Sequence, residues 1–280
     1  MFEARTVTSH ARFSRETGRR VGSTLVDSLN QMPQATWLFC AAKDGLEDLI
    51  AGIRDVTGTQ ALIGCTTDGE ISNEGFHSGS VVLGGVVTNK IQFHVTSVDH
   101  LGHDSEEAGR ELARKLPDSV RYVQLFSDGL TGNGCAILRG MRSILGDDVP
   151  VCGGAAADGE RFHRTWQFSG SRILTDAAVA IGFCGDFQVS TGVRSGWSPI
   201  GIAKRVTRAS GHVLYELDGR PALEVYGQFP GKHADRLPAV GVEYPLGIME
   251  ESDNLQDTDY NMLLRASMSV DKSSSSSWKS

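Results

Sequence analysis

The sequence predicts an α/β protein built from two homologous units, each a β-α-β arrangement extended by antiparallel strands into a mixed sheet. The pattern G-x-x-x-D-G-E occurs twice, as GCTTDGE at residues 64–70 and as GAAADGE at residues 154–160. Each copy follows a short apolar run and precedes a segment rich in strand-forming residues. Such an internal repeat indicates that one supersecondary unit has been duplicated.

The segments leading into the two motifs also match. The Leu-Phe pair at residues 38–39 corresponds to 125–126, and the apolar pattern of 49–56 corresponds to 137–144. The separations, 87, 88 and 90 residues, drift slowly along the chain, as small insertions in a duplicated unit would cause. We therefore expect a functional site where equivalent loops of the two units converge.

In the first unit, apolar residues at helical spacing predict an amphipathic helix within residues 12–31. A strand at 36–42 should be followed by a helix that Asp44 caps. The run at 61–65 is a strand that delivers the first motif.

Two more strands, 79–87 and 91–98, are separated by three residues and predict a hairpin. Asp104 and Glu107 have the spacing of a capping box at the start of the next helix, which Pro117 ends.

The second unit repeats this order, with a strand at 122–126, a helix at 135–145 and a strand at 149–153. Four further strand segments are predicted at residues 164–173, 177–184, 187–194 and 202–217, the last as a hairpin. A short helix with proline in its first turn is predicted at 221–229.

Composition limits the function classes. The 280 residues carry a net charge of -7 and a pI of about 5.6, with no cluster of Lys and Arg, which argues against a nucleic-acid partner. No signal-peptide pattern and no apolar run of ~18 residues is seen, so we expect a cytoplasmic protein that does not bind membranes. Five scattered cysteines without a CxxC pair predict reduced thiols, neither a disulfide frame nor a zinc site.

Five segments resemble the FIST family in order and spacing. They are GCTTDGEI at 64–71, SDGL at 127–130, GGAAADG at 153–159, GWSPIG at 196–201 and YELDGRPA at 215–222. The resemblance implies a FIST N-terminal sensory domain at 20–220, with internal repeats at about 36–100 and 122–195. A FIST C-terminal domain would begin at 221 and run, apparently truncated, to 271, and a serine-rich tail at 272–280 should be disordered.

The resemblance also implies a function. FIST proteins are sensory modules of bacterial-type intracellular signal transduction that bind small ligands, with amino acids proposed, and act beside partners such as histidine kinases or cyclic-dinucleotide enzymes. One branch of the family binds haem and senses nitric oxide. That branch does not share the GWSPIG form, so an amino acid is the preferred ligand here and haem the alternative. If part of the site lies in the missing C-terminal segment, the chain would bind nothing.

We expect the ligand between the two halves, at residues in or near the motifs. They are Cys65, Thr66, Thr67, Asp68, Glu70, Asp128, Gly153, Gly154, Asp158, Arg194 and Trp197. Thr66 and Thr67 would offer hydroxyl groups, and Asp68, Glu70 and Asp128 would offer carboxylates to a ligand amine. Arg194 is the candidate for a ligand carboxylate, through two hydrogen bonds. The competing interpretation is that Asp68 and Asp158 only close tight turns.

Catalysis is not expected. Cys65 lies in the first motif, but nothing in the sequence places a histidine beside it, so a cysteine-dependent hydrolase remains a secondary alternative. The eight histidines have no partners at ligand spacing, so no metal site is predicted. Trp197 is either a wall of the ligand site or a core residue.

Overall fold

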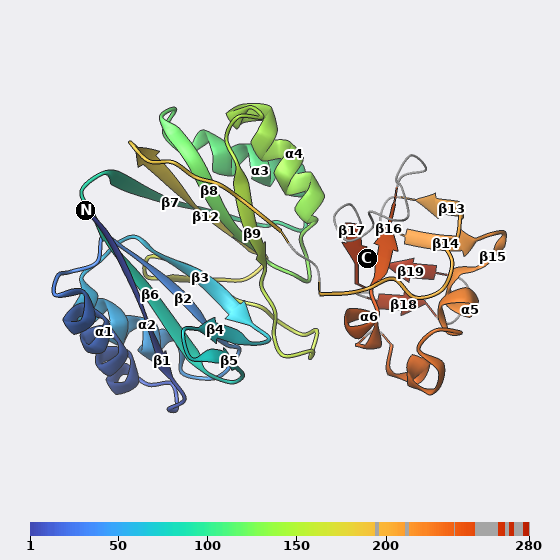
Figure 1. Cartoon of the computed structure of the whole chain (residues 1–280), viewed down its shortest axis with the longest axis horizontal. Coiled ribbons are helices and arrows are strands. Elements are labelled where there is room, and N and C mark those ends of the chain that lie inside the picture. Colours follow the sequence, from blue (N-terminus) through green and yellow to red (C-terminus); the bar gives the residue numbers. More distant parts are fainter. Residues whose placement is uncertain are drawn as a thin grey trace. The chain divides into compact units, whose positions relative to one another are not determined.

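The computed structural model describes residues 1–193, 196–210, 213–237, 239–249, 263–266, 269–271 and 277–279. The chain forms two compact units, Met1–Thr191 and Gly192–Ser280 (Figure 1). Both motifs lie in the first unit.

The first unit contains one order of elements twice. The first block comprises β1 (Phe2–Ser9), α1 (Arg15–Leu29), β2 (Ala35–Ala41), α2 (Leu46–Thr57), β3 (Leu62–Thr67), β4 (Glu70–Ser72), β5 (Gly75–His77) and β6 (Val81–Thr88). The second comprises β7 (Ile91–Asp99), α3 (Ser105–Arg114), β8 (Val120–Ser127), α4 (Gly134–Leu145), β9 (Val151–Ala155), β10 (Gln167–Ser169), β11 (Arg172–Leu174) and β12 (Ala177–Gly185). The predicted α/β class with mixed sheets is confirmed.

The strands form two large sheets, ordered β1-β6-β2-β3-β10-β11 and β7-β12-β8-β9. In each sheet the β-α-β pair is parallel, β2 with β3 and β8 with β9, and the other pairs are antiparallel. The hairpin β10–β11 belongs to the second block but completes the first sheet. As a result β3 is an interior strand, whereas its counterpart β9 is an edge strand.

Helices cover the outer face of each sheet, and the inner faces pack on each other. One core cluster lies between α1, α2 and the first sheet, and a second lies between α3, α4 and the second sheet. A third cluster, between the sheets, includes Ile63 and Cys65 from β3 and Val179 and Ile181 from β12. The resulting order of layers is helices, sheet, sheet, helices (Figure 1).

Equivalent residues of the two blocks contact each other across the inner core. The indole Nε1 of Trp37 donates to Oε1 of Gln124 at 2.7 Å. The rings of Phe39 and Phe126 meet edge to face with centroids 5.2 Å apart. Both pairs are separated by 87 residues, so the blocks are related by an approximate two-fold axis that passes close to β2 and β8.

Each helix pair is held together by glycines at equivalent positions. A Cβ on Gly52 of α2 would lie 2.1 Å from a carbonyl oxygen of α1, and a Cβ on Gly140 of α4 would lie 2.0 Å from one of α3. Gly18 and Gly109, on the facing helices, would each meet a carbonyl oxygen at 2.2 Å. The helix backbones therefore approach more closely than any side chain allows.

The helix starts follow side-chain capping, with one correction. Ser14, Asp104 and Asn133 accept main-chain N–H bonds at the starts of α1, α3 and α4. The predicted cap Asp44 is wrong, because the N-cap of α2 is the next residue, Gly45, whose φ of +91° turns the chain into the helix. The predicted capping box at α3 is half formed, since Glu107 pairs with arginines of its own helix and does not bond back to the cap.

The predicted hairpin of 79–87 with 91–98 is also wrong. β6 pairs with β1 and β2, whereas β7 pairs with β12 in the other sheet, so the short link between them joins the two blocks. The blocks consequently begin at β1 and β7, earlier than the predicted repeats. The edge strand β1 was not predicted, because its outward positions are polar or exposed.

Two other predicted strands differ. Residues 164–173 contain the hairpin β10–β11, with Gly170 in the turn at φ +62°. Residues 187–193 form no strand, and residue 194 lies outside the described residues.

The second unit contains short elements. They are β13 (Val206–Ser210), β14 (Val213–Leu217), β15 (Arg220–Pro221), α5 (Ala222–Tyr226), the 3-10 helix Gly231–Arg236, α6 (Val240–Glu243), β16 (Leu246–Ile248), β17 (Leu263–Arg265), β18 (Ser269–Asp271) and β19 (Ser277–Lys279). β13 pairs with β14, as the predicted hairpin requires. In the tail, 272–276 and 280 lie outside the described residues, whereas β19 pairs with β14 and β18 despite the predicted disorder. Main-chain hydrogen bonds, which do not depend on side-chain type, make that pairing possible.

The glycine contacts predict matched losses of stability in both blocks. Gly52→Ala and Gly140→Ala should each lower the free energy of unfolding by about 1–3 kcal/mol, because the added methyl group forces the helices apart. Gly134→Ala is the control, since a Cβ there meets nothing within 4 Å. Urea unfolding followed by circular dichroism measures the differences, and a Gly140→Ala protein as stable as the Gly134→Ala protein would contradict the packing.

Candidate functional site

The first motif loop is held by a buried carboxylate. Glu70 is only 1% exposed. Its Oε1 accepts from the Thr67 hydroxyl at 2.6 Å, and its Oε2 accepts from the Ser80 main-chain N–H at 3.0 Å and the Ser80 hydroxyl at 2.6 Å. These bonds tie the end of β3 to the start of β6. In this structure Glu70 therefore organises the loop and does not face solvent.

The second loop is organised around Asp158, which is 4% exposed. One carboxylate oxygen accepts from the N–H groups of Arg161 and Phe162 at 3.1 and 3.0 Å, and the other from those of His163 and Arg164 at 2.8 and 3.0 Å. Burial by itself raises the pKa of Asp158, but the main-chain N–H donors, assisted by the Arg161 guanidinium, outweigh burial and lower the pKa below its usual value.

The two motif loops lie against each other. The Gly159 N–H donates to Oδ1 of Asp68 at 2.6 Å, and the Ala157 N–H donates to the Thr66 carbonyl at 2.9 Å. The Thr66 hydroxyl also accepts from the Trp166 N–H at 3.1 Å. We call this contact region, residues 66–70 with 156–166, the loop seam.

Arg161 is a seam residue that the sequence interpretation missed. Its Nε donates to the Asp158 carbonyl at 2.6 Å, and its Nη2 donates to the Ala42 carbonyl, at the end of β2, at 2.7 Å. The second block thus contributes a cation to the first. Asp68 and Arg161 are both exposed, so the seam presents a carboxylate and a guanidinium to solvent. The only sequence signal was its position directly after the second motif.

Asp128 plays a turn-forming role at the end of β8. Its carboxylate is 4% exposed and accepts from the N–H groups of Leu130, Thr131 and Asp176 at 2.8, 3.2 and 3.0 Å. Among the predicted carboxylates, the structure therefore leaves Asp68 as the exposed one. For Asp158, the four hydrogen bonds from its own loop agree with the competing interpretation that this aspartate closes a turn.

The two motifs do not superimpose residue by residue. Gly64 lies opposite Leu38 on β2, and Gly153 lies opposite Leu125 on β8. A Cβ would lie 1.8 Å from the Leu38 carbonyl oxygen in the first case and 1.7 Å from the Leu125 carbonyl oxygen in the second. Gly64 is therefore equivalent to Gly153, and Cys65 to Gly154.

The remaining predicted site residues lie elsewhere. Gly153 and Gly154 are exposed on β9. Trp197 lies in the second unit, where its indole N–H donates to the Glu243 carbonyl at 3.0 Å. Arg194 lies outside the described residues.

Cys65 is not placed for nucleophilic chemistry. It is 3% exposed, and burial raises the pKa of its thiol to about 12. The neighbouring Cys40 is fully buried, and burial, followed by the charges of Glu70 and Cys65, raises its pKa well above the usual value. At neutral pH both groups are thiols, whereas a nucleophile requires the thiolate.

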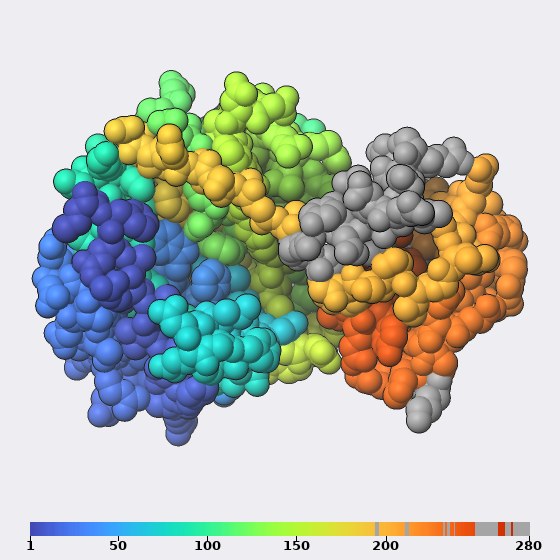
Figure 2. Space-filling model, in the orientation of Figure 1, coloured from blue at the N-terminus to red at the C-terminus, as the bar shows by residue number. Residues whose placement is uncertain are grey.

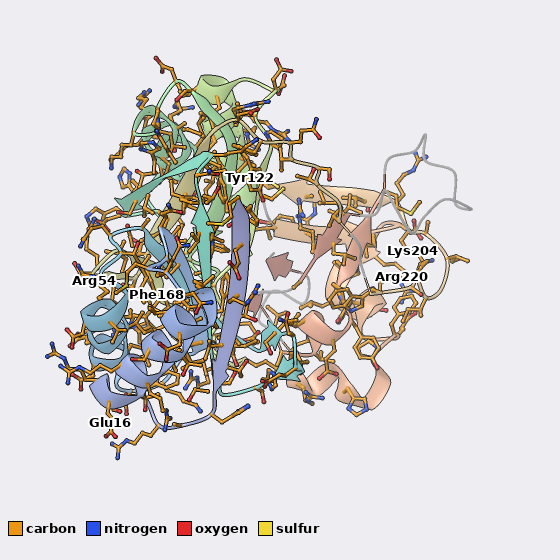
Figure 3. All side chains as sticks on the ribbon, turned by 60° about the vertical axis from the view of Figure 1, so that its left-hand side comes forward. Glu16, Arg54, Tyr122, Phe168, Lys204 and Arg220 are labelled. Carbon is orange, nitrogen blue, oxygen red and sulfur yellow. The ribbon has the colours of Figure 1, made fainter. Side chains whose placement is uncertain are left out.

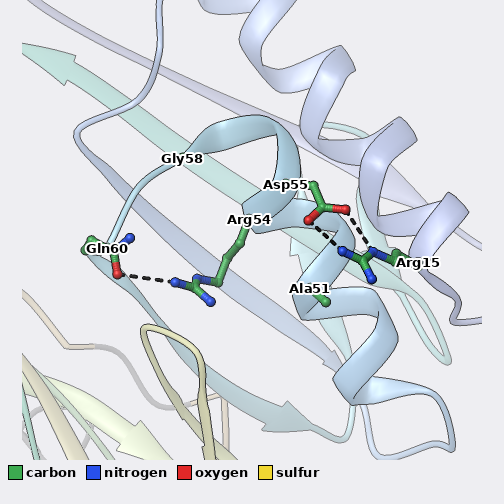
Figure 4. Close-up of a pocket in the computed structure, with 6 residues that line it drawn as sticks. All are labelled: Arg15, Ala51, Arg54, Asp55, Gly58 and Gln60. Atoms are coloured by element: carbon green, nitrogen blue, oxygen red, sulfur yellow. Dashed lines mark hydrogen bonds and ion pairs between the residues drawn. The ribbon is translucent and has the colours of Figure 1, made fainter.

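Two cavities lie at the other end of β3, around Arg54. One, of about 340 Å³, is lined by Arg15, Ala51, Arg54, Asp55, Gly58 and Gln60 (Figure 4). The second, of about 310 Å³, is lined by Glu47, Ile50, Ala51, Arg54, Ser171 and Ile173. Arg54 donates to Gln60 at 3.2 Å, and its buried Nε has no partner within the described part of the chain. These cavities adjoin the amino end of β3, whereas the loop seam adjoins its carboxyl end.

The described residues contain neither a metal-ligand cluster nor a helix that could span a membrane. Among those described, His, Cys, Asp and Glu side chains form no group of three or more that could hold a metal ion. Within the described residues, no helix combines the length and apolar character needed to span a bilayer.

The lowered pKa of Asp158 predicts a pH-dependent contribution to stability. Because the folded-state pKa lies below the unfolded value of about 3.9, the contribution is present above that value and is lost as the pH falls through the folded pKa. Asp158→Asn should cost about 1–3 kcal/mol at pH 7, since one amide oxygen replaces two acceptor oxygens. The cost should shrink toward pH 2. A constant cost from pH 7 to pH 2 in denaturant titrations would contradict the assignment.

The environment of Cys65 predicts slow alkylation. At pH 7.5 iodoacetamide should modify the exposed Cys135 at least tenfold faster than Cys65 or Cys40, as judged by peptide mass spectrometry. In denaturant the three rates should become similar. Preferential modification of Cys65 in the folded protein would instead favour the hydrolase alternative.

Comparisons with known proteins identify relatives of this chain. An uncharacterized protein of Methanocaldococcus jannaschii, MJ1623, is 28% identical over 200 residues, which are 66% of this chain and 38% of that protein. An uncharacterized protein of Mycobacterium tuberculosis, Rv0628c, is 29% identical over 192 residues, 64% of this chain and 46% of that protein. The chain thus spans less than half the length of these curated relatives.

Among solved structures, cyanuric acid hydrolase from A. caulinodans matches 71% of this chain and 69% of its own, with a TM-score of 0.35 and 11% identity. A similarity at that level assigns neither fold nor activity. The model of the FIST N domain, in contrast, matches residues 34–220, more than half of the chain. FIST domains are in general sensor domains that bind small ligands in signal transduction. The chain belongs to the FIST family.

Proposed function

We propose that this chain senses an amino acid or a similar small zwitterion at the loop seam, without catalytic activity of its own. The observation that supports this most is the bond from Gly159 N–H to Asp68 Oδ1, because it joins the two motif loops through an exposed carboxylate. A ligand at this position contacts both blocks at once.

The charges of the seam suit a zwitterion. Asp68 is the exposed carboxylate of the first loop and would bind the ligand ammonium group. Arg161, exposed on the second loop, replaces Arg194 as our candidate for the ligand carboxylate, since a guanidinium can form two parallel hydrogen bonds. The hydroxyls of Thr66 and Thr67 are already engaged within the protein, so they support the loop and do not reach the ligand.

Hydrogen bonds of Asp68 and Thr66 join the two loops across the seam, and a ligand that contacts both loops would change how they pack. If one packing of the loops binds the ligand more tightly, binding shifts the population toward that packing. A signalling partner, such as a histidine kinase or a cyclic-dinucleotide enzyme, would then bind the two packings unequally. The cysteine-dependent alternative is weakened by the buried, protonated Cys65.

A ligand screen with matched variants tests the proposal. A ligand at ~100 times its dissociation constant adds about 2.7 kcal/mol to the stability of the folded state, so a thermal-shift screen of amino acids should yield a hit. Asp68→Asn keeps an oxygen for the Gly159 N–H but removes the charge, and should weaken that ligand at least tenfold. Arg161→Gln should do the same.

Asp118→Asn is the control, because Asp118 is an exposed acid in the connection between α3 and β8. It should leave the affinity unchanged. A shift with haem alone would contradict an amino-acid ligand. Equal affinities of the Asp68→Asn and Asp118→Asn proteins would move the site away from the seam.

A further inference from the structure

The two blocks differ most at one strand edge. In the first block Gly64, Cys65 and Thr66 of β3 are buried, whereas in the second block the equivalent Gly153, Gly154 and Ala155 of β9 are exposed. The cause is the hairpin β10–β11, which pairs with the outer edge of β3. Among the described residues, no strand pairs with the outer edge of β9.

Every second residue of β9 directs its main-chain hydrogen-bonding groups away from β8, toward the open edge. The Val123 N–H donates to the Pro150 carbonyl and the Ala156 N–H donates to the Ser127 carbonyl, so alternate residues from 150 to 156 face β8. The intervening residues, Val151, Gly153 and Ala155, therefore direct their N–H and carbonyl groups to the open edge. An unpaired row of this kind is a template for another strand.

The first block shows what occupies such an edge. Phe168 of β10 lies opposite Gly64, and Gln167 and Ser169 flank it. The Gly170 N–H donates to the Leu62 carbonyl at 2.8 Å, and the Thr66 N–H donates to the Trp166 carbonyl at 2.9 Å. Phe168 is fully buried in the core between the helices and the first sheet (Figure 3).

Helix α4, beside β9, is less covered than the equivalent helix α2 of the first block. Ile50 of α2, next to the hairpin, is 2% exposed, whereas the equivalent Leu138 of α4 is only half-buried. The partly uncovered Leu138 therefore lies beside the open edge of β9, whereas in the first block Phe168 of the hairpin fills the corresponding position.

We propose that the outer edge of β9 is a docking site for an extended segment of a partner protein. The segment pairs antiparallel with β9 and presents a large apolar side chain opposite Gly153, between polar residues, as β10 does on β3. Such strand addition draws affinity from the main-chain bonds and specificity from the alternate side chains.

A second copy of this chain fits the edge less well. Pairing of two β9 strands would place glycines opposite glycines, with nothing to cover Leu138.

The hairpin β4–β5 also lies at the surface (Figure 2). It carries the exposed Ile71 and Phe76, but Glu70, at its start, is buried and anchored to Ser80. The docking site does not depend on the identity of the sensed ligand.

A peptide that copies residues 164–175 of this chain is the probe, because it carries the strand that occupies the equivalent edge. The labelled peptide should bind the full chain in fluorescence anisotropy, and Phe168→Asp in the peptide should weaken binding at least tenfold. Hydrogen–deuterium exchange should show that the peptide slows exchange at Val151, Gly153 and Ala155.

Two protein variants locate the binding. Ala155→Pro removes an outward N–H group, and Gly154→Lys places a charge at the edge where a Cβ meets nothing within 4 Å. Each should weaken the peptide at least tenfold with an unchanged melting midpoint, whereas the control Gly134→Lys should bind normally.

Three results would overturn the proposal. The first is no binding at millimolar peptide, and the second is binding that Gly154→Lys leaves intact. The third is concentration-dependent self-association in sedimentation velocity with slow exchange at β9 before any peptide is added, which would assign the edge to a second copy.

Discussion

The packing of the two sheets on each other determines the rest of the first unit. Trp37 with Gln124, and Phe39 with Phe126, are equivalent residues that contact each other across the inner core. Because equivalent positions on β2 and β8 meet, the parallel strands beside them end near one another. The loops that follow β3 and β9 are thereby brought together without long-range signals in their own sequences.

The two copies have diverged from this common arrangement. In the first motif only two residues separate β3 from β4, and Glu70 anchors the turn, whereas the second motif leads into a long loop folded around Asp158. That long loop carries β10 across to the first sheet and brings Arg161 to the end of β2. The same crossing closes the edge of β3 and leaves that of β9 open. One asymmetry therefore accounts for both the charged seam and the exposed strand.

Local patterns predicted the helices and most strands of the first unit, because hydrophobic spacing and capping residues act over a few positions. The duplicated motif predicted two similar units, because the repeat is visible in the sequence itself. The sheet to which β7 belongs could not be predicted, since a three-residue link suits a hairpin and a crossing between blocks equally well. The equivalence of Gly64 with Gly153 was hidden by the adjacent Gly154, and only the pairing with Leu38 and Leu125 reveals it.

The ligand site was predictable only in part. Charged residues in a repeated motif indicated a site, but Glu70, Asp128 and Asp158 are acceptors for groups of the protein itself, which the sequence does not distinguish from ligand contacts. Arg161 was missed because its position depends on the path of the second loop.

Hydrogen–deuterium exchange of the full chain, with and without the amino acid that most raises its melting temperature, tests the loop seam as the sensing site most directly. If the ligand binds there, amides in residues 66–70 and 156–166 should exchange more slowly when it is present. Protection confined to the residues around Arg54, with an unchanged seam, would contradict the assignment and place the ligand in the cavities at the opposite end of β3.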